Sequence, residues 1–436
     1  MGFGKPRSAA GTLRVHRTRR LLTALACVGL TLGGAHAQVG TDFAPDDALE
    51  ETLIDACFGS NKIDTVALFQ TDPDRALRIF NLCSNAFPGE LAASPGDSSR
   101  FASNINLGTI GRGTSGTGKL GDEVRKRLQE REDDSNERRS ADGRSGGSAG
   151  ESLTIGDMGV FFTGQVSDTD RNPTRLENGF DDTASSFVLG ADYGFDTGVP
   201  FLLGIAVSRE ENRTRFEGGN GRLDSLATSL MLYGSVSPLD GVTLNVYLGR
   251  SHAENETDRP VSLGNLSGIV RTQYDSDRVL GGVGAAYDLF LGDWNITLAG
   301  NLDYTRTRVD AHRENGTTAL EVDFERQRQR SLIGSLGLGL GHTTWFEWGS
   351  VTPRIEARYA HEFENDARTI KAALQVAPDR RVVFLTDSPD RHYGFVGGGL
   401  TIQTNGGLQL FANYEQMLGH AYMRNKAVFG GVAARF

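Results

Sequence analysis

The sequence predicts an all-β fold: a 12-stranded antiparallel transmembrane β-barrel with a pore helix and a small α-helical N-terminal domain. Three observations predict it: a long series of short alternating strands ending on the aromatic Phe436, a secretion signal at the start, and a composition too polar for membrane helices. In one strand Trp294 and Ile296 fall on one face, and Asn295 and Thr297 on the other. A barrel with an apolar outside and a polar inside accounts for many such strands in series.

The composition argues against two classes of protein, those that span membranes by helices and those that bind nucleic acid. The 436 residues are 38% hydrophobic, the mean hydropathy is -0.32 and the net charge is -10. A membrane-spanning helix needs about 20 apolar residues in a row, which would raise the hydropathy well above this value. A transmembrane barrel needs only alternation. The acidic balance argues against a nucleic-acid partner, because such proteins carry a basic surface.

Residues 1–37 have the pattern of a signal peptide. Six basic residues between Lys5 and Arg20 precede an apolar run, Leu21–Leu32, that is too short to span a bilayer. Ala35-His36-Ala37 then matches the small-x-small cleavage pattern, so the mature chain is expected to begin at Gln38. The alternative is a retained membrane anchor.

Residues 38–117 are expected to form a small helical region followed by a Gly/Ser-rich linker. Asp46–Cys57 has helical periodicity and acidic residues in its first turn. Pro73 is placed to start a second helix, in which Leu77, Phe80 and Cys83 share a face.

Two cysteines, Cys57 and Cys83, remain after the signal is removed. An even number of cysteines in an exported protein favours one disulfide. It would close a loop of about 25 residues and stabilise the fold by roughly 3 kcal/mol in the chain-entropy model. Two free thiols are the alternative.

Residues 118–150 are expected to hold a charged helix that spans the pore, followed by a flexible spacer. Asp122–Asp134 is rich in helix formers and has opposite charges three and four residues apart, but it has only a narrow apolar stripe. Such a helix suits a water-filled lumen, with a solvated linker as the alternative. The charged positions expected to matter are Glu123, Arg127, Glu130 and Arg131.

Residues 151–436 are expected to form the barrel. An even number of strands is typical of single-chain bacterial barrels. The twelve expected strands are 156–168, 183–196, 200–215, 225–238, 242–256, 272–290, 293–310, 322–344, 350–364, 392–404, 407–417 and 422–436.

The expected connections alternate in length, as transmembrane barrels require of their two ends. The short ones are 197–198, 239–241, 292, 345–349 and 405–406. The long ones are 169–182, 216–224, 257–271, 311–321 and 365–391.

Three charged residues of one strand, Arg354, Glu356 and Arg358, are expected to face the lumen. They alternate with Ile355, Ala357 and Tyr359, and charges facing lipid would cost several kcal/mol. We expect them to pair with Glu123, Arg127, Glu130 and Arg131 of the pore helix. A hydrated lumen lining with no specific partner is the alternative.

Residues 122–436 resemble the bacterial autotransporter family of type V secretion. The resemblance rests on the charged helix before the first strand, the number of strands, the strand Pro353–Phe363 and the ending Phe429–Phe436. The terminal Phe436 resembles the signal that outer-membrane barrels present to the barrel-assembly machinery.

The resemblance implies an outer-membrane translocator of a Gram-negative bacterium, which displays its own N-terminal passenger at the cell surface. It also implies outer-membrane lipid and lipopolysaccharide, the barrel-assembly machinery and periplasmic chaperones as partners, and a monomeric barrel. Here the passenger would be unusually short and without solenoid repeats. Autocleavage by paired asparagines is not expected, since the helix has only Asn136.

Two other functions remain as alternatives: a plain outer-membrane channel with a periplasmic N-terminal region, and a surface enzyme with an unrecognised passenger. Gly96-Asp97-Ser98-Ser99 superficially resembles the nucleophile block of lipase-like relatives. No strand precedes it and no histidine lies nearby in the sequence, although acyl transfer needs a base. We therefore expect no enzyme, and no catalytic residue, metal or cofactor.

Overall fold

The computed structural model describes residues 52–53, 55–57, 63–86, 157–196, 199–263, 265–364 and 366–435. All of them belong to one compact unit, residues 43–436. The expected signal peptide, the segment 118–150 and Phe436 lie outside the described residues, so the expectations for them stay predictions. No helix in the described ranges is both long and apolar enough to cross a membrane.

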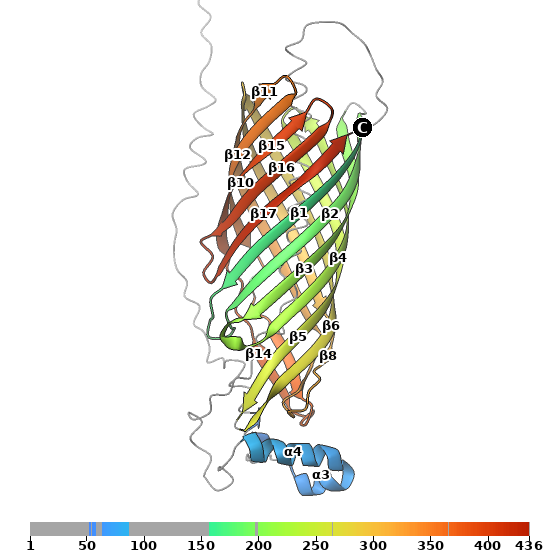
Figure 1. The fold of residues 1–436 in the computed structure, drawn as a ribbon, viewed down its shortest axis with the longest axis vertical. Coiled ribbons are helices and arrows are strands. Elements are labelled where there is room, and N and C mark those ends of the chain that lie inside the picture. Colours follow the sequence, from blue (N-terminus) through green and yellow to red (C-terminus); the bar gives the residue numbers. More distant parts are fainter. Residues whose placement is uncertain are drawn as a thin grey trace, which may run out of the picture. The chain divides into compact units, whose positions relative to one another are not determined.

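Twelve antiparallel strands form a closed barrel, as the alternation predicts (Figure 1). Each strand pairs with its neighbours in sequence order, and the pairing of β1 with β17 closes the ring. The strands are β1 (Asp157–Arg171), β2 (Phe180–Asp196), β3 (Pro200–Phe216), β4 (Arg222–Leu239), β5 (Val242–Leu263), β6 (Leu266–Leu291), β7 (Trp294–Val309), β10 (Gln327–His342), β12 (Gly349–Glu362), β15 (His392–Thr404), β16 (Leu408–Leu418) and β17 (Met423–Arg435). A short strand β11 (Thr344–Phe346) extends the pairing with β12, and a 3-10 helix η4 (Glu217–Gly219) links β3 to β4.

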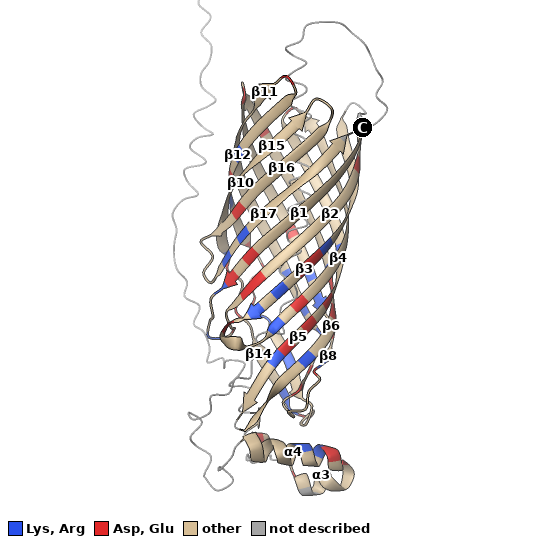
Figure 2. Cartoon of the chain, in the orientation of Figure 1, with Lys and Arg blue, Asp and Glu red and all other residues tan. Residues whose placement is uncertain are grey.

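The barrel has an apolar outer face and a more polar inner face. On β7, Leu298 is 54% exposed, whereas its neighbour Thr297 is 2% exposed. The outward residues of β7 from Trp294 to Tyr304 are apolar or aromatic, apart from a glycine. Ten steps of about 3.3 Å, tilted by about 40°, give an apolar band of roughly 25 Å, the height of a bilayer core. Charged residues gather beyond this band, on the half of the strands away from the C-terminus (Figure 2).

We call the two ends of the barrel the turn end and the loop end. At the turn end, Leu239 pairs with Val242 and Leu291 pairs with Trp294, so the chain reverses over two residues. Gly241 and Gly292 have φ of 72° and 67°, a conformation that favours glycine in tight hairpins. Both turns lie where the sequence predicts short connections.

The loop end differs from the sequence prediction at the β5–β6 connection. The expected loop over 257–271 is a continuation of both strands, which pair up to Leu263 and Leu266. Its apolar positions Val261, Leu263 and Val270 are buried against chain segments distant in sequence, which a local pattern does not reveal.

A second sheet lies at the loop end, with the strand order β14-β13-β9-β8. It contains β8 (His312–Arg313), β9 (Val322–Phe324), β13 (Thr369–Leu374) and β14 (Arg381–Leu385). The expected loops 311–321 and 365–391 therefore carry strands, and the strand expected over 322–344 is split into β9 and β10. These strands are short, and the pairing of β9 with β13 joins residues about 50 positions apart, such as Phe324 and Ala372. Alternation alone therefore does not distinguish them from loops.

The N-terminal described residues are helical. Residues 52–53 and 55–57 are followed by α3 (Thr65–Thr71) and α4 (Pro73–Ala86), which starts at the expected proline. Asp64 and Asp72 cap these helices, since their Oδ1 atoms accept hydrogen bonds from Ala67 N at 3.0 Å and Arg75 N at 3.1 Å.

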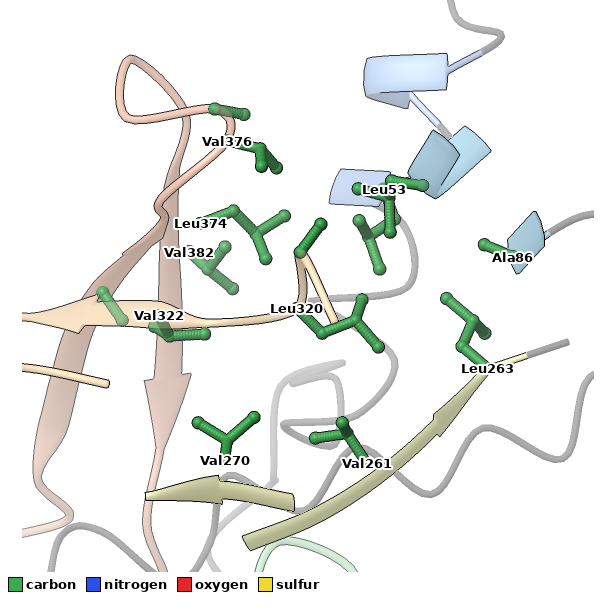
Figure 3. Packing of buried hydrophobic residues seen from close by; sticks show 14 of the residues in the cluster. Leu53, Ala86, Val261, Leu263, Val270, Leu320, Val322, Leu374, Val376 and Val382 are labelled. Carbon is green, nitrogen blue, oxygen red and sulfur yellow. The ribbon is translucent and has the colours of Figure 1, made fainter. Parts of the chain in front are cut away.

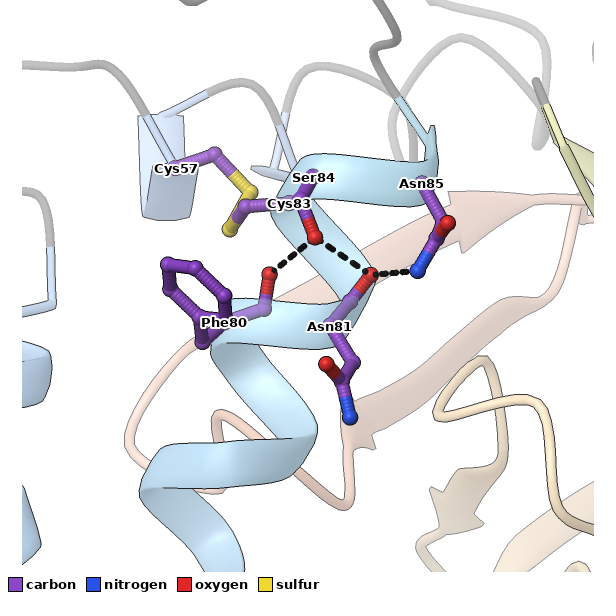
Figure 4. The surroundings of a disulfide bond; sticks show 6 residues. All are labelled: Cys57, Phe80, Asn81, Cys83, Ser84 and Asn85. Carbon is purple, nitrogen blue, oxygen red and sulfur yellow. Dashed lines mark hydrogen bonds between the residues drawn. A yellow bond between two sulfur atoms is a disulfide. The ribbon is translucent and has the colours of Figure 1, made fainter.

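The structure contains the Cys57–Cys83 disulfide, which joins the first helical segment to α4 with a Cα–Cα distance of 5.5 Å (Figure 4). The face of α4 that carries Leu77 and Phe80 is largely exposed, at 54% and 59%. The buried stripe consists instead of Ala76, Ile79, Leu82 and Ala86.

Candidate functional site

The N-terminal helices, the tip of the β5–β6 hairpin and the second sheet share one hydrophobic core, and we call this assembly the cap. Leu53 of the first helical segment is fully buried and lies in the same cluster as Leu320 and Leu374 (Figure 3). Eighteen buried residues form the cluster: Leu53, Ile79, Leu82, Ala86, Val261, Leu263, Val270, Ala319, Leu320, Val322, Phe324, Ile370, Ala372, Leu374, Val376, Ala377, Val382 and Phe384. The helices are therefore part of the barrel's extramembrane core.

Polar contacts also attach the helices to the barrel. Arg75 Nε of α4 donates to the carbonyl oxygen of Val376 at 2.9 Å. Asn265 N, at the tip of the β5–β6 hairpin, donates to the carbonyl oxygen of Asn85 at 2.8 Å. Asp55 forms an ion pair with Arg380. The first two bonds satisfy backbone groups beside the apolar contact, as buried interfaces require.

A buried ion pair fixes the loops inside the cap. Arg259 of β5 and Glu314, which follows β8, are each 1% exposed at the side chain. Arg259 Nε donates to Glu314 Oε1 at 2.8 Å and its Nη2 also donates to Leu320 O at 3.2 Å. Glu314 Oε2 accepts a further hydrogen bond from Val322 N at 2.8 Å. The pair thus holds β5, the segment after β8 and β9 in one arrangement.

His312 lies in an aromatic stack within the cap. Its ring is 4.3 Å from the ring of Tyr274 and 5.0 Å from that of Phe324, nearly parallel to both. Its Nδ1 donates to the carbonyl oxygen of Asp310 at 2.9 Å. Burial lowers the pKa of His312 below its usual 6.5, although this hydrogen bond opposes the shift.

At the loop end, an ion-pair network joins the β1–β2 connection to the loop after β14. Arg171, at the end of β1, donates to Glu177 Oε2 at 2.8 Å and pairs with Asp387 of the loop after β14. Asp387 N donates to Glu177 Oε2 at 3.1 Å, and the Arg171 guanidinium lies 4.7 Å from the centre of the Tyr422 ring. Burial raises the pKa of Asp387 and raises that of Tyr422 to about 12. A cavity of about 590 Å³ lies beside this network.

The three charged residues expected in the lumen lie on the β12 face opposite Ile355 and Tyr359, which are 63% and 49% exposed. Arg358 forms an ion pair with Glu415 of β16 at 3.1 Å, and its guanidinium lies 4.3 Å from the centre of the Phe395 ring. Arg354 and Glu356 also have polar partners. The expected helix partners Glu123, Arg127, Glu130 and Arg131 lie outside the described residues, so pairing with them stays a prediction.

The cap residues are those that sequence reasoning missed. Arg259 and Glu314 lie in segments expected to be solvated loops, where charged residues carry no signal. The alternation of Val261 and Leu263 before the hairpin tip is the sequence signal that indicates a buried strand there. Within the described ranges, no three His, Cys, Asp or Glu side chains gather as a metal site would require.

Residues 160–415 match the model of the family described as the autotransporter beta-domain. The barrel is similar to the β-domain of the Bordetella autotransporter BrkA, with a TM-score of 0.51 and 16% identity over 64% of this chain and 99% of that one. It is similar to the translocator domain of autotransporter NalP from Neisseria meningitidis, with a TM-score of 0.51 and 15% identity over 73% and 97%. Both likenesses concern the fold.

A curated relative also matches part of the chain. The chain is 28% identical over 124 residues, or 28% of its length, to "Esterase EstA" of Pseudomonas aeruginosa. The match spans 18% of the esterase's own length.

Removal of Arg259 should loosen the cap. Arg259→Met leaves Glu314 buried without its partner, which costs about 3–5 kcal/mol. We expect faster hydrogen exchange at the amides of Ala372 and Leu374. Glu314→Gln added to this variant should restore part of the protection. Arg313→Gln, which breaks the exposed pair with Asp323, should change nothing in the cap. Equal protection in Arg259→Met and the parent would contradict this role.

Acid should also loosen the cap through His312. Because its folded pKa lies below the unfolded value of about 6.5, the unfolded state binds the proton first as the pH falls. The cap's free energy of opening should therefore be highest above about pH 6.5 and decline below it. Hydrogen exchange at several pH values, corrected for intrinsic rates, measures this. His312→Gln should flatten the dependence, while His252→Gln, on an exposed position, should retain it. A slope unaffected by His312→Gln would exclude this histidine as its source.

Proposed function

We propose, because this chain belongs to the autotransporter family, that it displays its own short N-terminal helical segment at the cell surface. The barrel is an outer-membrane translocator domain, as the family match and the fold establish. What it translocates is the proposal: the passenger is the disulfide-linked helical region that ends at α4. It stays attached to the barrel as part of the cap.

The observation that carries this proposal is the end of the barrel on which the helices pack. Asn85 is bonded to Asn265, at the tip of the β5–β6 hairpin. The C-terminal strand ends at the turn end, where Arg435 pairs with Gly159. Barrels of this kind have short turns on the periplasmic side and long loops outside. This rule supports the proposal that the helices lie outside the cell.

The route of the chain follows from the same placement. Ala86 belongs to the cap, whereas β1 begins at the turn end with Asp157. Residues 87–156 therefore connect the two ends of the barrel. They contain many charged residues, which a path through lipid would leave unsatisfied. We propose that they cross through the lumen, with Glu123, Arg127, Glu130 and Arg131 near Arg354, Glu356 and Arg358.

The two alternatives have less support. An open channel needs a clear mouth, but at the loop end the Arg171, Glu177 and Asp387 network holds the β1–β2 connection against the loop after β14. The partial likeness to an esterase favours a surface enzyme as the second candidate. It spans too little of that protein to carry over its activity, and Gly96–Ser99 lies outside the described residues. We therefore propose transport and display without catalysis.

Surface display is tested with an inserted epitope. An epitope inserted after Gln38 should be recognised by antibody on intact cells, because the helical segment lies outside. The matched control is the same epitope inserted between Asp240 and Gly241 in the β4–β5 turn, which should be recognised only after the outer membrane is permeabilised. Recognition of the Gln38 epitope only in permeabilised cells would reject display in favour of a periplasmic N-terminal region.

The lumen route is tested by conductance. The triple variant Arg354→Gln, Glu356→Gln and Arg358→Gln should have a higher single-channel conductance in planar bilayers, because the pore segment would lose its charged contacts. Glu415→Gln is the control, since it weakens the pair between Arg358 and β16 but leaves Arg354, Glu356 and Arg358 themselves unchanged. This control should keep the low conductance of a nearly closed pore. A triple variant that conducts like the parent would count against the pairing.

A further inference from the structure

Four arginines form a compact basic patch on the outer face of the barrel. Arg306 pairs directly with Arg330 across β7 and β10, and Arg308 pairs directly with Arg328. All four side chains are exposed, and they follow Tyr304 on the same face of β7 and β10. Like charges directly opposite each other destabilise a sheet, so such a patch calls for an anion to compensate it. We name Arg306, Arg308, Arg328 and Arg330 the arginine quartet.

The acidic groups near the quartet compensate little of its charge. Asp310 Oδ1 lies 3.4 Å from Arg308 Nε and 3.5 Å from Arg326 Nε. Asp277 of β6 lies directly beside Arg308 of β7, but it already contacts Arg250 and His252 at 3.3 Å each. Within the described part of the chain, Arg306, Arg328 and Arg330 form no ion pair. Arg328 and Arg330 also border the cavity of about 590 Å³ beside the Arg171 network.

Elsewhere on the outer face the charges beyond the apolar band are mixed. Arg213 on β3 is paired with Glu211 two residues away, at 2.5 Å. Asp168 of β1 lies directly beside Lys426 of β17. The quartet therefore differs from the rest of the described outer face beyond the apolar band, because it gathers four cations with no acidic residue between them.

An apolar groove of about 570 Å³ lies on the same face, next to the quartet on the membrane side. Leu302, Leu336, Tyr359 and Phe363 line it, and Gly300 and Gly334 let it deepen between them. Gly334 lies four residues from Arg330, or about 13 Å along β10. The groove opens within the apolar band, so its natural content is hydrocarbon.

We propose that the quartet and the groove together bind a phosphorylated glycolipid of the outer leaflet, lipopolysaccharide. Its phosphates would lie on the arginines, whose planar guanidinium groups suit phosphate oxygens, and one acyl chain would lie in the groove. The groove distinguishes this ligand from free phosphate, since an inorganic anion has nothing to place there. The orientation, with the quartet at the outer leaflet, rests on the proposed function.

Binding is tested on the full-length protein in detergent, with bis-phosphorylated lipid A as the probe and native mass spectrometry as the readout. Arg306→Gln, Arg308→Gln, Arg328→Gln and Arg330→Gln combined should weaken binding by at least about tenfold, because charge-assisted bonds to phosphate are lost. The matched control is Arg209→Gln, Arg213→Gln, Arg424→Gln and Lys426→Gln, four cations on the other outer strands. It should bind lipid A as the parent does.

The groove is tested with Gly300→Leu. A Cβ at this position would lie 3.4 Å from the Leu336 side chain, so the substitution fits the barrel while filling the groove. It should weaken binding of lipid A and leave binding of inorganic phosphate unchanged. Lipid A without phosphates should bind weakly to the parent. Heat-dependent mobility on gels verifies that each variant is folded. If the quadruple variant does not fold, the double variants Arg306→Gln/Arg330→Gln and Arg308→Gln/Arg328→Gln replace it in the binding test.

Three results would overturn the proposal: unchanged lipid A binding in the folded quartet variants, an equal loss in the control, or equal binding of the phosphate-free lipid. Unchanged lipid A binding in Gly300→Leu would overturn the role of the groove. Because this measurement uses detergent-solubilised protein, its failure leaves surface display untouched. The epitope after Gln38 reports on display separately.

Discussion

The whole structure depends on one constraint, that backbone polar groups in hydrocarbon must be bonded to each other. A sheet meets it only by closing, as β1 does on β17. Closure gives every strand one face toward lipid and one toward the lumen, and the two-residue period then sorts the side chains. Leu298 and Thr297 are neighbours in the chain but lie in different solvents. The apolar band, the polar lumen and the charged rim all follow from this sorting.

Beyond the membrane the constraint changes, because water again drives apolar groups together. The long β5 and β6, the second sheet and the N-terminal helices are held by a buried core of aliphatic side chains around Leu320 and Leu374. Three short helical segments with one disulfide have little core of their own, as small domains generally do. Ile79 and Leu82 are buried because the barrel's extramembrane segments complete that core. The N-terminal helices and the loop end of the barrel thus form one hydrophobic unit.

The sequence predicts the barrel well and the cap poorly, for physical reasons. Strand count, faces and the tight turns at Gly241 and Gly292 depend on local alternation and on glycine, both visible in a single sequence. The second sheet depends on contacts such as that between Ala372 and Phe324, which alternation within either segment does not reveal. The exposed Leu77 and the buried Ile79 show the same limit, because the partner that selects a helix face lies far along the chain.

The shared core of helices and barrel has a directional consequence. Leu53, Ile79 and Leu82 meet their partners only at the loop end. On the proposed route through the lumen, their burial would be available only after the segment has crossed. At about 2 kcal/mol for each side chain, an upper estimate is roughly 6 kcal/mol, or a factor of about 10⁴ against return. On that route such an interaction would act as a ratchet, because random motion in the pore would become one-way without a nucleotide or an ion gradient. The helices would then be the cargo, and the rest of the cap would be the thermodynamic sink that retains them.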